Sequence, residues 1–138
     1  MATTFKLYKD SGLTQVFTPG VDFIGPVTNP PEDFVLYLGS TDAANKVEAA
    51  SNPGVDQIVV FITDTDPGNK LETTDVKLAT SAGGLPGATG GASLNLGTSI
   101  VGGVGNAQPI HIRVSYSGGL TSDQTVGIAL NTLVESVI

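Results

Sequence analysis

Alternation of apolar and polar residues with a period of two is the sequence feature that most constrains the fold. In PIHIRVSY (109–116), Ile110, Ile112 and Val114 alternate with polar residues. In an extended strand, alternate side chains point to opposite faces, so this pattern is typical of a strand with one buried face. We expect these three side chains to form one stripe of the core.

Other segments share this strand-like character, and Pro- or Gly-containing turn signals separate them. IVVFI (58–62) is a β-branched run, and we expect it to be buried on both faces. The remaining candidate strands are TFKLY (4–8), FVLYLG (34–39), VKLAT (76–80), ASLNLG (92–97) and TVGIAL (125–130). The turn signals lie at 29–33, 52–54, 66–69, 85–87 and 117–119. The pattern predicts an all-β fold, an antiparallel β-sandwich of about 7–8 short strands with little helix.

The only helix candidate is TDAANKVEAAS (41–51). It begins with residues that can cap a helix, and Asn52-Pro53 ends it. The segment is short, so we expect either one or two helical turns or a loop.

Length and charge distribution favour one domain. Of the nineteen charged residues, sixteen lie in 1–78, and only Arg113, Asp123 and Glu135 lie in 79–138. About sixty residues are few for an independent core, and strand patterns occur on both sides of the change in charge. We therefore expect a single β-sandwich domain over 1–138, with apolar termini that extend and dock on a partner.

Composition excludes several classes of function. A net charge of −7 opposes binding to nucleic acid, and the absence of cysteine excludes disulfides and thiolate chemistry. No run of apolar residues is long enough to span a bilayer or to resemble a secretory signal, so we expect a protein made in the cytoplasm, without a membrane partner.

Residues 81–108 hold nine of the eighteen glycines and no charged side chain. Their spacing matches no phosphate-binding motif, since GGVG (102–105) is not extended to GxGxxG. Apolar residues such as Leu94, Leu96 and Ile100 recur within the stretch, which argues against a flexible linker. We expect ordered turns, bulges and close packing contacts.

The best metal candidate is ITDTDPGNKLE (62–72), where Asp64, Asp66, Asn69 and Glu72 offer oxygen ligands for calcium. Their spacing does not match an EF-hand loop. We favour a solvated hairpin end whose side chains bond their own backbone, and therefore expect no metal and no cofactor.

Few residues of the sequence are candidates for acid–base or nucleophilic catalysis. His111 is the only histidine and lies in the middle of a predicted strand, and no carboxylate occurs from Val76 to Ser122. We expect no catalytic role for His111, and a protein that is not an enzyme.

Four segments share a cadence of short strands broken by Gly and Ala-Ser-Leu turns: LYLGSTDA (36–43), VKLATSAGGL (76–85), GASLNLGTSIVGG (91–103) and NAQPIHIRV (106–114). With this cadence, residues 34–135 resemble small virion structural proteins of tailed bacteriophages. The resemblance implies a β-sandwich that decorates or cements a capsid, or builds part of the neck or tail. It implies the major capsid protein or other virion proteins as partners, a homo-oligomer, and a location in the virion.

Charge-poor composition agrees with this expectation, because burying few ions in protein contacts limits the desolvation cost. The sequence leaves two other classes open, a carbohydrate-binding β-sandwich adhesin and a hydrolase. Exposed aromatic side chains around a groove would favour the adhesin, and a carboxylate pair or a Ser–His contact in a cleft would favour the hydrolase.

Overall fold

A computed structural model of the chain describes residues 4–18, 31–65, 68, 72–116 and 126–138. Apart from three short 3-10 turns, its regular structure is all β. The described residues form eleven strands: β1 (Lys6–Tyr8), β2 (Val16–Phe17), β3 (Glu32–Gly39), β4 (Asn45–Ala49), β5 (Val59–Asp64), β6 (Val76–Ala79), β7 (Leu94–Asn95), β8 (Ile100–Val101), β9 (Gln108–Val114), β10 (Val126–Leu130) and β11 (Leu133–Val137). The turns are η1 (Thr73–Asp75), η2 (Ala82–Gly84) and η3 (Val104–Asn106).

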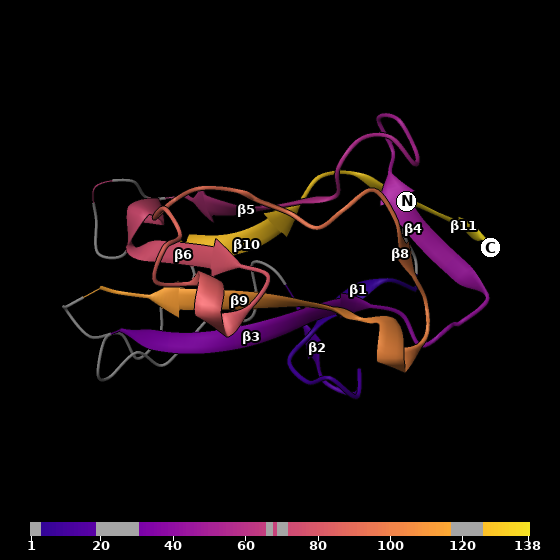
Figure 1. Cartoon of the computed structure of the whole chain (residues 1–138), viewed down its shortest axis with the longest axis horizontal. Coiled ribbons are helices and arrows are strands. Elements are labelled where there is room, and N and C mark those ends of the chain that lie inside the picture. The colour runs from indigo at the N-terminus through magenta and orange to yellow at the C-terminus, as the bar shows by residue number, and fades with distance from the viewer. Residues whose placement is uncertain (1–3, 19–30, 66–67, 69–71, 117–125) are drawn as a thin grey trace.

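The strands form three antiparallel sheets (Figure 1). The largest has the order β2-β1-β3-β9-β6, the second β10-β5-β7 and the third β11-β4-β8. The first two sheets lie in two layers along the long axis, and the third stands at the end of the molecule where the chain terminates. The expected antiparallel, sandwich-like fold with little helix is confirmed.

Strands β3 and β9 form the centre of the largest sheet, and their register explains its buried face. Phe34 pairs with Ile112, and Leu36 pairs with Ile110. Cross-strand partners share a face, so the alternating apolar residues of both strands point into the core. Ile110, Ile112 and Val114 are at most 1% exposed, which confirms the predicted stripe.

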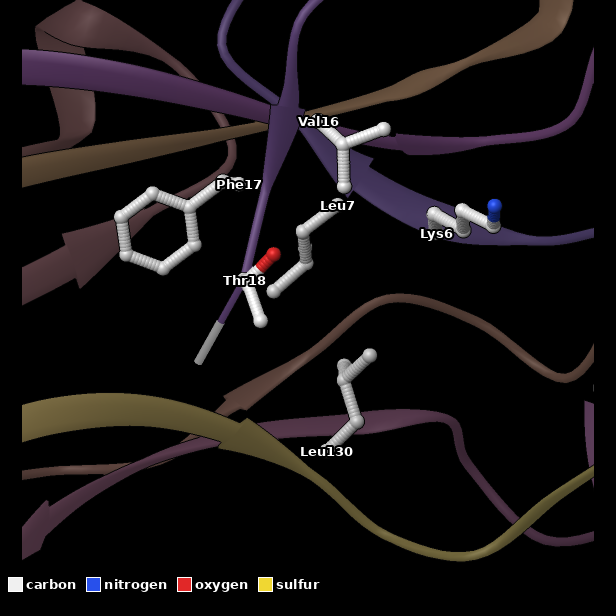
Figure 2. A pocket seen from close by; sticks show the side chains of 6 residues that line it. All are labelled: Lys6, Leu7, Val16, Phe17, Thr18 and Leu130. Atoms are coloured by element: carbon white, nitrogen blue, oxygen red, sulfur yellow. The ribbon is translucent and has the colours of Figure 1, made fainter. Parts of the chain in front are cut away.

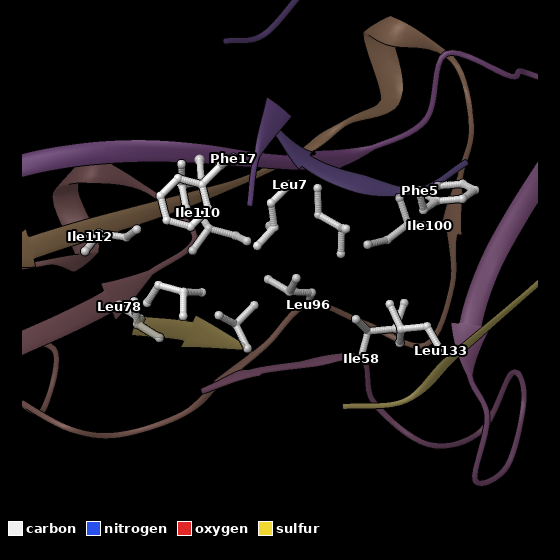
Figure 3. Close-up of a cluster of buried hydrophobic side chains, with 14 of the residues drawn as sticks. Phe5, Leu7, Phe17, Ile58, Leu78, Leu96, Ile100, Ile110, Ile112 and Leu133 are labelled. Atoms are coloured by element: carbon white, nitrogen blue, oxygen red, sulfur yellow. The ribbon is translucent and has the colours of Figure 1, made fainter. Parts of the chain in front are cut away.

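One hydrophobic cluster draws on all three sheets (Figure 3). Ile110 and Ile112 contribute from the largest sheet, Val60 and Ile128 from the second. The third sheet contributes side chains that include Leu133 and Ile100. Contacts between the three sheets therefore stabilise the fold mainly through apolar burial.

The predicted strands all occur where the chain is described, but β5 differs from expectation. Val60 is buried, Phe61 is exposed and the other four residues of this strand, which lies at the centre of a three-stranded sheet, are intermediate. Phe61 is 37% exposed, so the prediction of burial on both faces is wrong. Among the predicted turns, 117–119 lies outside the described residues and 29–33 and 66–69 do so in part.

The helix candidate at 41–51 is wrong, because Asn45–Ala49 forms β4. Strands β11 and β8 pair with its two edges, and Val47 and Ala49 alternate into the core. Asp42, which resembles a helix cap in sequence, forms a turn instead: its carboxylate accepts a 3.0 Å hydrogen bond from the Ala44 N–H. Pairing on both edges outweighs a weak local preference for helix.

The glycine-rich stretch is ordered, as expected, and close approach explains two of its glycines. A Cβ at Gly102 would lie 1.9 Å from the carbonyl oxygen of Asp42, and a Cβ at Gly90 would lie 2.1 Å from that of Thr74. Neither contact is possible for a residue with a side chain. Gly102 also donates its N–H to Asn45 O at 2.7 Å, which joins the stretch to the start of β4.

Candidate functional site

Two of the four predicted calcium ligands, Asp64 and Glu72, line a cavity of about 490 Å³ together with Thr73 and Thr74. Asp66 and Asn69 lie outside the described residues. The Glu72 carboxylate accepts the N–H of Gly68. This carboxylate therefore bonds backbone within its own loop, as expected for a hairpin end. Within the described ranges, no three His, Cys, Asp or Glu side chains gather as metal ligands.

A cation that bound only the folded state would raise the melting temperature. Because we expect no metal to bind at this hairpin end, millimolar calcium should leave the melting temperature unchanged. Thermal unfolding followed by circular dichroism, with calcium and with a chelator, measures this. A calcium-dependent rise that Asp64→Asn removes would contradict the expectation. Lys77→Gln, a change of the same magnitude in charge outside the cavity lining, is the control.

His111 lies in the middle of β9 on the outer face of the largest sheet, opposite Val35 and Ala79. On the same face, Arg113 donates from Nε and Nη2 to the two carboxylate oxygens of Asp33, at 2.7 and 3.0 Å. The hydrogen bond from Arg113 lowers the pKa of Asp33. Such an exposed pair contributes little to stability, and its place across two strands agrees with a structural role.

Most of the exposed large apolar side chains in the described chain belong to the third sheet or the loops beside it. Seven large hydrophobic residues are exposed in the described part of the chain, and five of them belong to this sheet or the loops beside it. We call these five the exposed end: Val55, Val101, Val104, Val137 and Ile138. Val137 and Ile138 are 74% and 65% exposed, although the preceding part of β11 packs within the chain. Docking of the apolar C-terminal segment on a partner stays a prediction.

An apolar groove of about 400 Å³ lies between the second sheet and the edge of the largest sheet (Figure 2). Leu130 of β10 lines one side, and side chains of β1 and β2 line the other. Its lining residues within the described chain are Lys6, Leu7, Val16, Phe17, Thr18 and Leu130. Lys6 is the one charged residue among them. The groove can accept apolar groups and offers no described pair of acid–base side chains.

A partly buried polar cluster joins Thr4, near the start of the described chain, to Glu135 of β11. Glu135 of β11 accepts hydrogen bonds from the Thr4 N–H at 2.9 Å, from the Thr4 hydroxyl at 2.5 Å and from Asn45 Nδ2 at 2.8 Å. Ser40, which is fully buried, donates to the Thr4 hydroxyl at 2.8 Å. We call Thr4, Ser40, Asn45 and Glu135 the Glu135 cluster. Its serine is inaccessible to a substrate, so the cluster is structural.

The electrostatics of the cluster favour an ionised carboxylate. Burial raises the pKa of Glu135, but the hydrogen bonds from Thr4 and Asn45 together lower it by more. The resulting pKa is about 2. Sequence reasoning missed both this cluster and the apolar groove, because their residues are far apart in the chain. The only sequence signal was the apolar C-terminus itself.

In the described chain, no helix has the length and apolar character needed to cross a bilayer. Comparison with protein-family models, with curated proteins and with solved structures finds no match to this chain. The function must therefore be argued from its own residues.

Proposed function

We propose that this protein is a structural component of a tailed-phage virion, a capsid decoration or cement protein that stabilises the shell through protein–protein contacts. The observation that carries the proposal is the exposed end: of the seven large hydrophobic side chains that are exposed in the described residues, five belong to the third sheet or the loops beside it. They lie on both faces of this sheet, since Val101 pairs with Lys46 and Val137 pairs with the adjacent residue Asn45. Apolar side chains concentrated on one part of a surface are typical of interaction sites. A place in the neck or tail is the nearest alternative, since it would use the same kind of contact.

An ion pair lies on the same face of the third sheet as Val101. Lys46 and Glu48 lie on the solvent face of β4 with Lys46 Nζ and Glu48 Oε1 3.7 Å apart. Val101 pairs with Lys46 across the sheet and is 41% exposed. Protein interfaces are depleted of charged residues at their centre and keep polar residues at the rim. Because β4 is the central strand of this sheet, a contact that covers Val101 would be centred away from the ion pair, toward the edge strand β8.

The carbohydrate-binding alternative has less support. Sugar-binding surfaces use aromatic faces that are open to solvent, and Phe61 is the one exposed aromatic residue of the described chain. Tyr8 is 7% exposed, and Tyr37 is half-buried. Neither side chain offers an open ring.

Electron microscopy of particles purified from host cells that produce the tagged protein tests the proposal. We expect density that repeats with the symmetry of the capsid, and loss of that density with the double variant Val55→Asp, Val104→Asp. The double variant Asp56→Asn, Gln57→Glu is the control, because it changes exposed polar residues of the same region. Absence of the protein from the particles, or tight binding of a glycan by the free monomer, would overturn the proposal.

A further inference from the structure

We propose that the outer edge of β10 accepts an extended strand of a partner protein, which adds to the second sheet and lays its apolar side chains in the apolar groove. The inference goes beyond the proposed function, because this surface is separate from the exposed end. It rests on two observations. The first is the direction of the backbone groups of β10, and the second is the groove that lies beside the same edge.

The register of β10 with β5 shows which backbone groups of this edge strand point outward. Just after β10, Asn131 donates its N–H to Val59 O at 3.2 Å, which marks this pair as hydrogen-bonded. Bonded pairs alternate along an antiparallel ladder, so Val126, Ile128 and Leu130 direct their N–H and C=O groups away from β5. Within the described residues, no strand pairs with this outer edge of β10.

The strand itself lacks the features that usually prevent strand addition. Natural edge strands are protected by charged side chains, by proline or by a bulge. Val126–Leu130 contains neither a charge nor a proline, and its register with β5 is continuous over all five residues. The edge of β10 can therefore pair with another strand.

The apolar groove supplies a place for the side chains of such a strand. It measures about 400 Å³ and lies between Leu130 of β10 and the strands β1 and β2 of the facing layer (Figure 2). Leu7 and Phe17 form its floor, whereas Lys6 and Val16 alternate to the outer face of the largest sheet and line only the rim. A strand added beside β10 would therefore direct alternate side chains onto an apolar floor.

The facing layer favours a single extended segment over a second copy of this chain. If two copies paired edge to edge through β10, each would bring its own largest sheet into the layer that β1 and β2 of the other copy already occupy. One extended segment carries no second layer and avoids this collision. In strand addition, main-chain hydrogen bonds give affinity and pockets for alternate side chains give specificity. The partner segment therefore has apolar residues at alternate positions, and it runs antiparallel to β10 because that pairing is the more stable.

Amide hydrogen exchange followed by NMR tests the outer edge in the free protein. We expect the amides of Val126, Ile128 and Leu130 to exchange about tenfold or more faster than those of Gly127 and Ala129, which bond β5. Strong protection of the three outward amides in the free protein would overturn the inference, because the edge would then be covered already.

An acetylated heptapeptide of alternating threonine and valine is the probe for the added strand. In antiparallel pairing, the valines that share the buried face with Ile128 also exchange hydrogen bonds with β10. N-methylation of the threonines leaves these bonds intact and blocks self-association of the peptide, so we expect this version to bind and to protect the three outward amides. N-methylation of the valines removes the bonds, so we expect this version to bind about tenfold or more weakly. Equal affinity of the two peptides, or no binding of either, would contradict the inference.

Leu130→Asp tests the contribution of the groove. The change places a carboxylate against the inward valines, so we expect the affinity for the threonine-methylated peptide to fall by about tenfold or more. Ala129→Asp is the matched control, because it introduces the same carboxylate one residue away on the outer face of the second sheet. Thermal unfolding of both variants checks the fold, and the two peptides on the wild-type protein decide the question even where Leu130→Asp is unstable.

Two further outcomes would count against the inference. Equal loss of affinity in both variants would mean that the groove does not hold the added side chains. A protein that dimerises in sedimentation velocity while protecting the same three amides would mean that β10 pairs with a second copy. Neither result bears on the exposed end or on the presence of the protein in particles, so a failure here is distinguishable from a failure of the proposed function.

Discussion

Ile112→Asp is expected to prevent folding. Ile112 is fully buried, pairs with Phe34 and Leu78 across the largest sheet, and belongs to the cluster that draws on all three sheets. The change removes about 2 to 3 kcal/mol of apolar burial. It also places a carboxylate where the penalty for an unpaired charge is several kcal/mol. A domain with a typical unfolding free energy of about 5 to 15 kcal/mol does not tolerate both losses.

Soluble yield and thermal unfolding followed by circular dichroism measure this effect. His111→Asp is the matched control, because it introduces the same carboxylate one residue away on the outer face of the same strand. We expect the control to remain soluble and to unfold cooperatively. A folded Ile112→Asp protein with a cooperative transition would mean that the assigned face of β9 is wrong.

The buried stripe of β9 could be predicted from the local sequence, because the two-residue period of a strand is visible in a few residues. The alternation of Ile110, Ile112 and Val114 reports directly which side chains share a face. The same reasoning failed at 41–51, where Asn45–Ala49 could fit either structure. This segment forms a strand because it pairs with β11, far along the chain, and with β8. The residues within the segment itself therefore do not determine whether it is helix or strand.

The apolar groove shows the same limit. It combines Leu7 and Phe17 with Leu130, which only the fold brings together. Likewise, in the sequence Glu135 is an isolated charge near the end of a nearly uncharged segment. Its partners Thr4 and Asn45 are 131 and 90 residues away in sequence.

Glu135→Ala is expected to destabilise the protein by about 1.5 to 3 kcal/mol, the range for hydrogen bonds to a charged group. The change leaves the Thr4 N–H and hydroxyl and the Asn45 amide without their shared acceptor. Chemical denaturation at neutral pH measures the loss. Glu48→Ala is the control, since Glu48 lies on the solvent face of the neighbouring strand and its ion pair with Lys46 is partly exposed. An equal loss in both variants would contradict a special role for Glu135.

Acid should reveal the same contribution without removing the side chain, because protonation weakens the carboxylate as an acceptor. The pKa of Glu135 is about 2 in the folded protein and 4.5 in its unperturbed state. A carboxylate with a lowered folded pKa stabilises the fold fully above its unfolded pKa, and that contribution is lost as the pH falls through the folded value. The difference in unfolding free energy between wild type and Glu135→Gln should therefore be constant at neutral pH and shrink from about pH 4.5 toward pH 2. Other carboxylates titrate in both proteins and largely cancel in this comparison. A difference that stays constant down to pH 2 would show that Glu135 holds the two chain ends together by shape and not by charge.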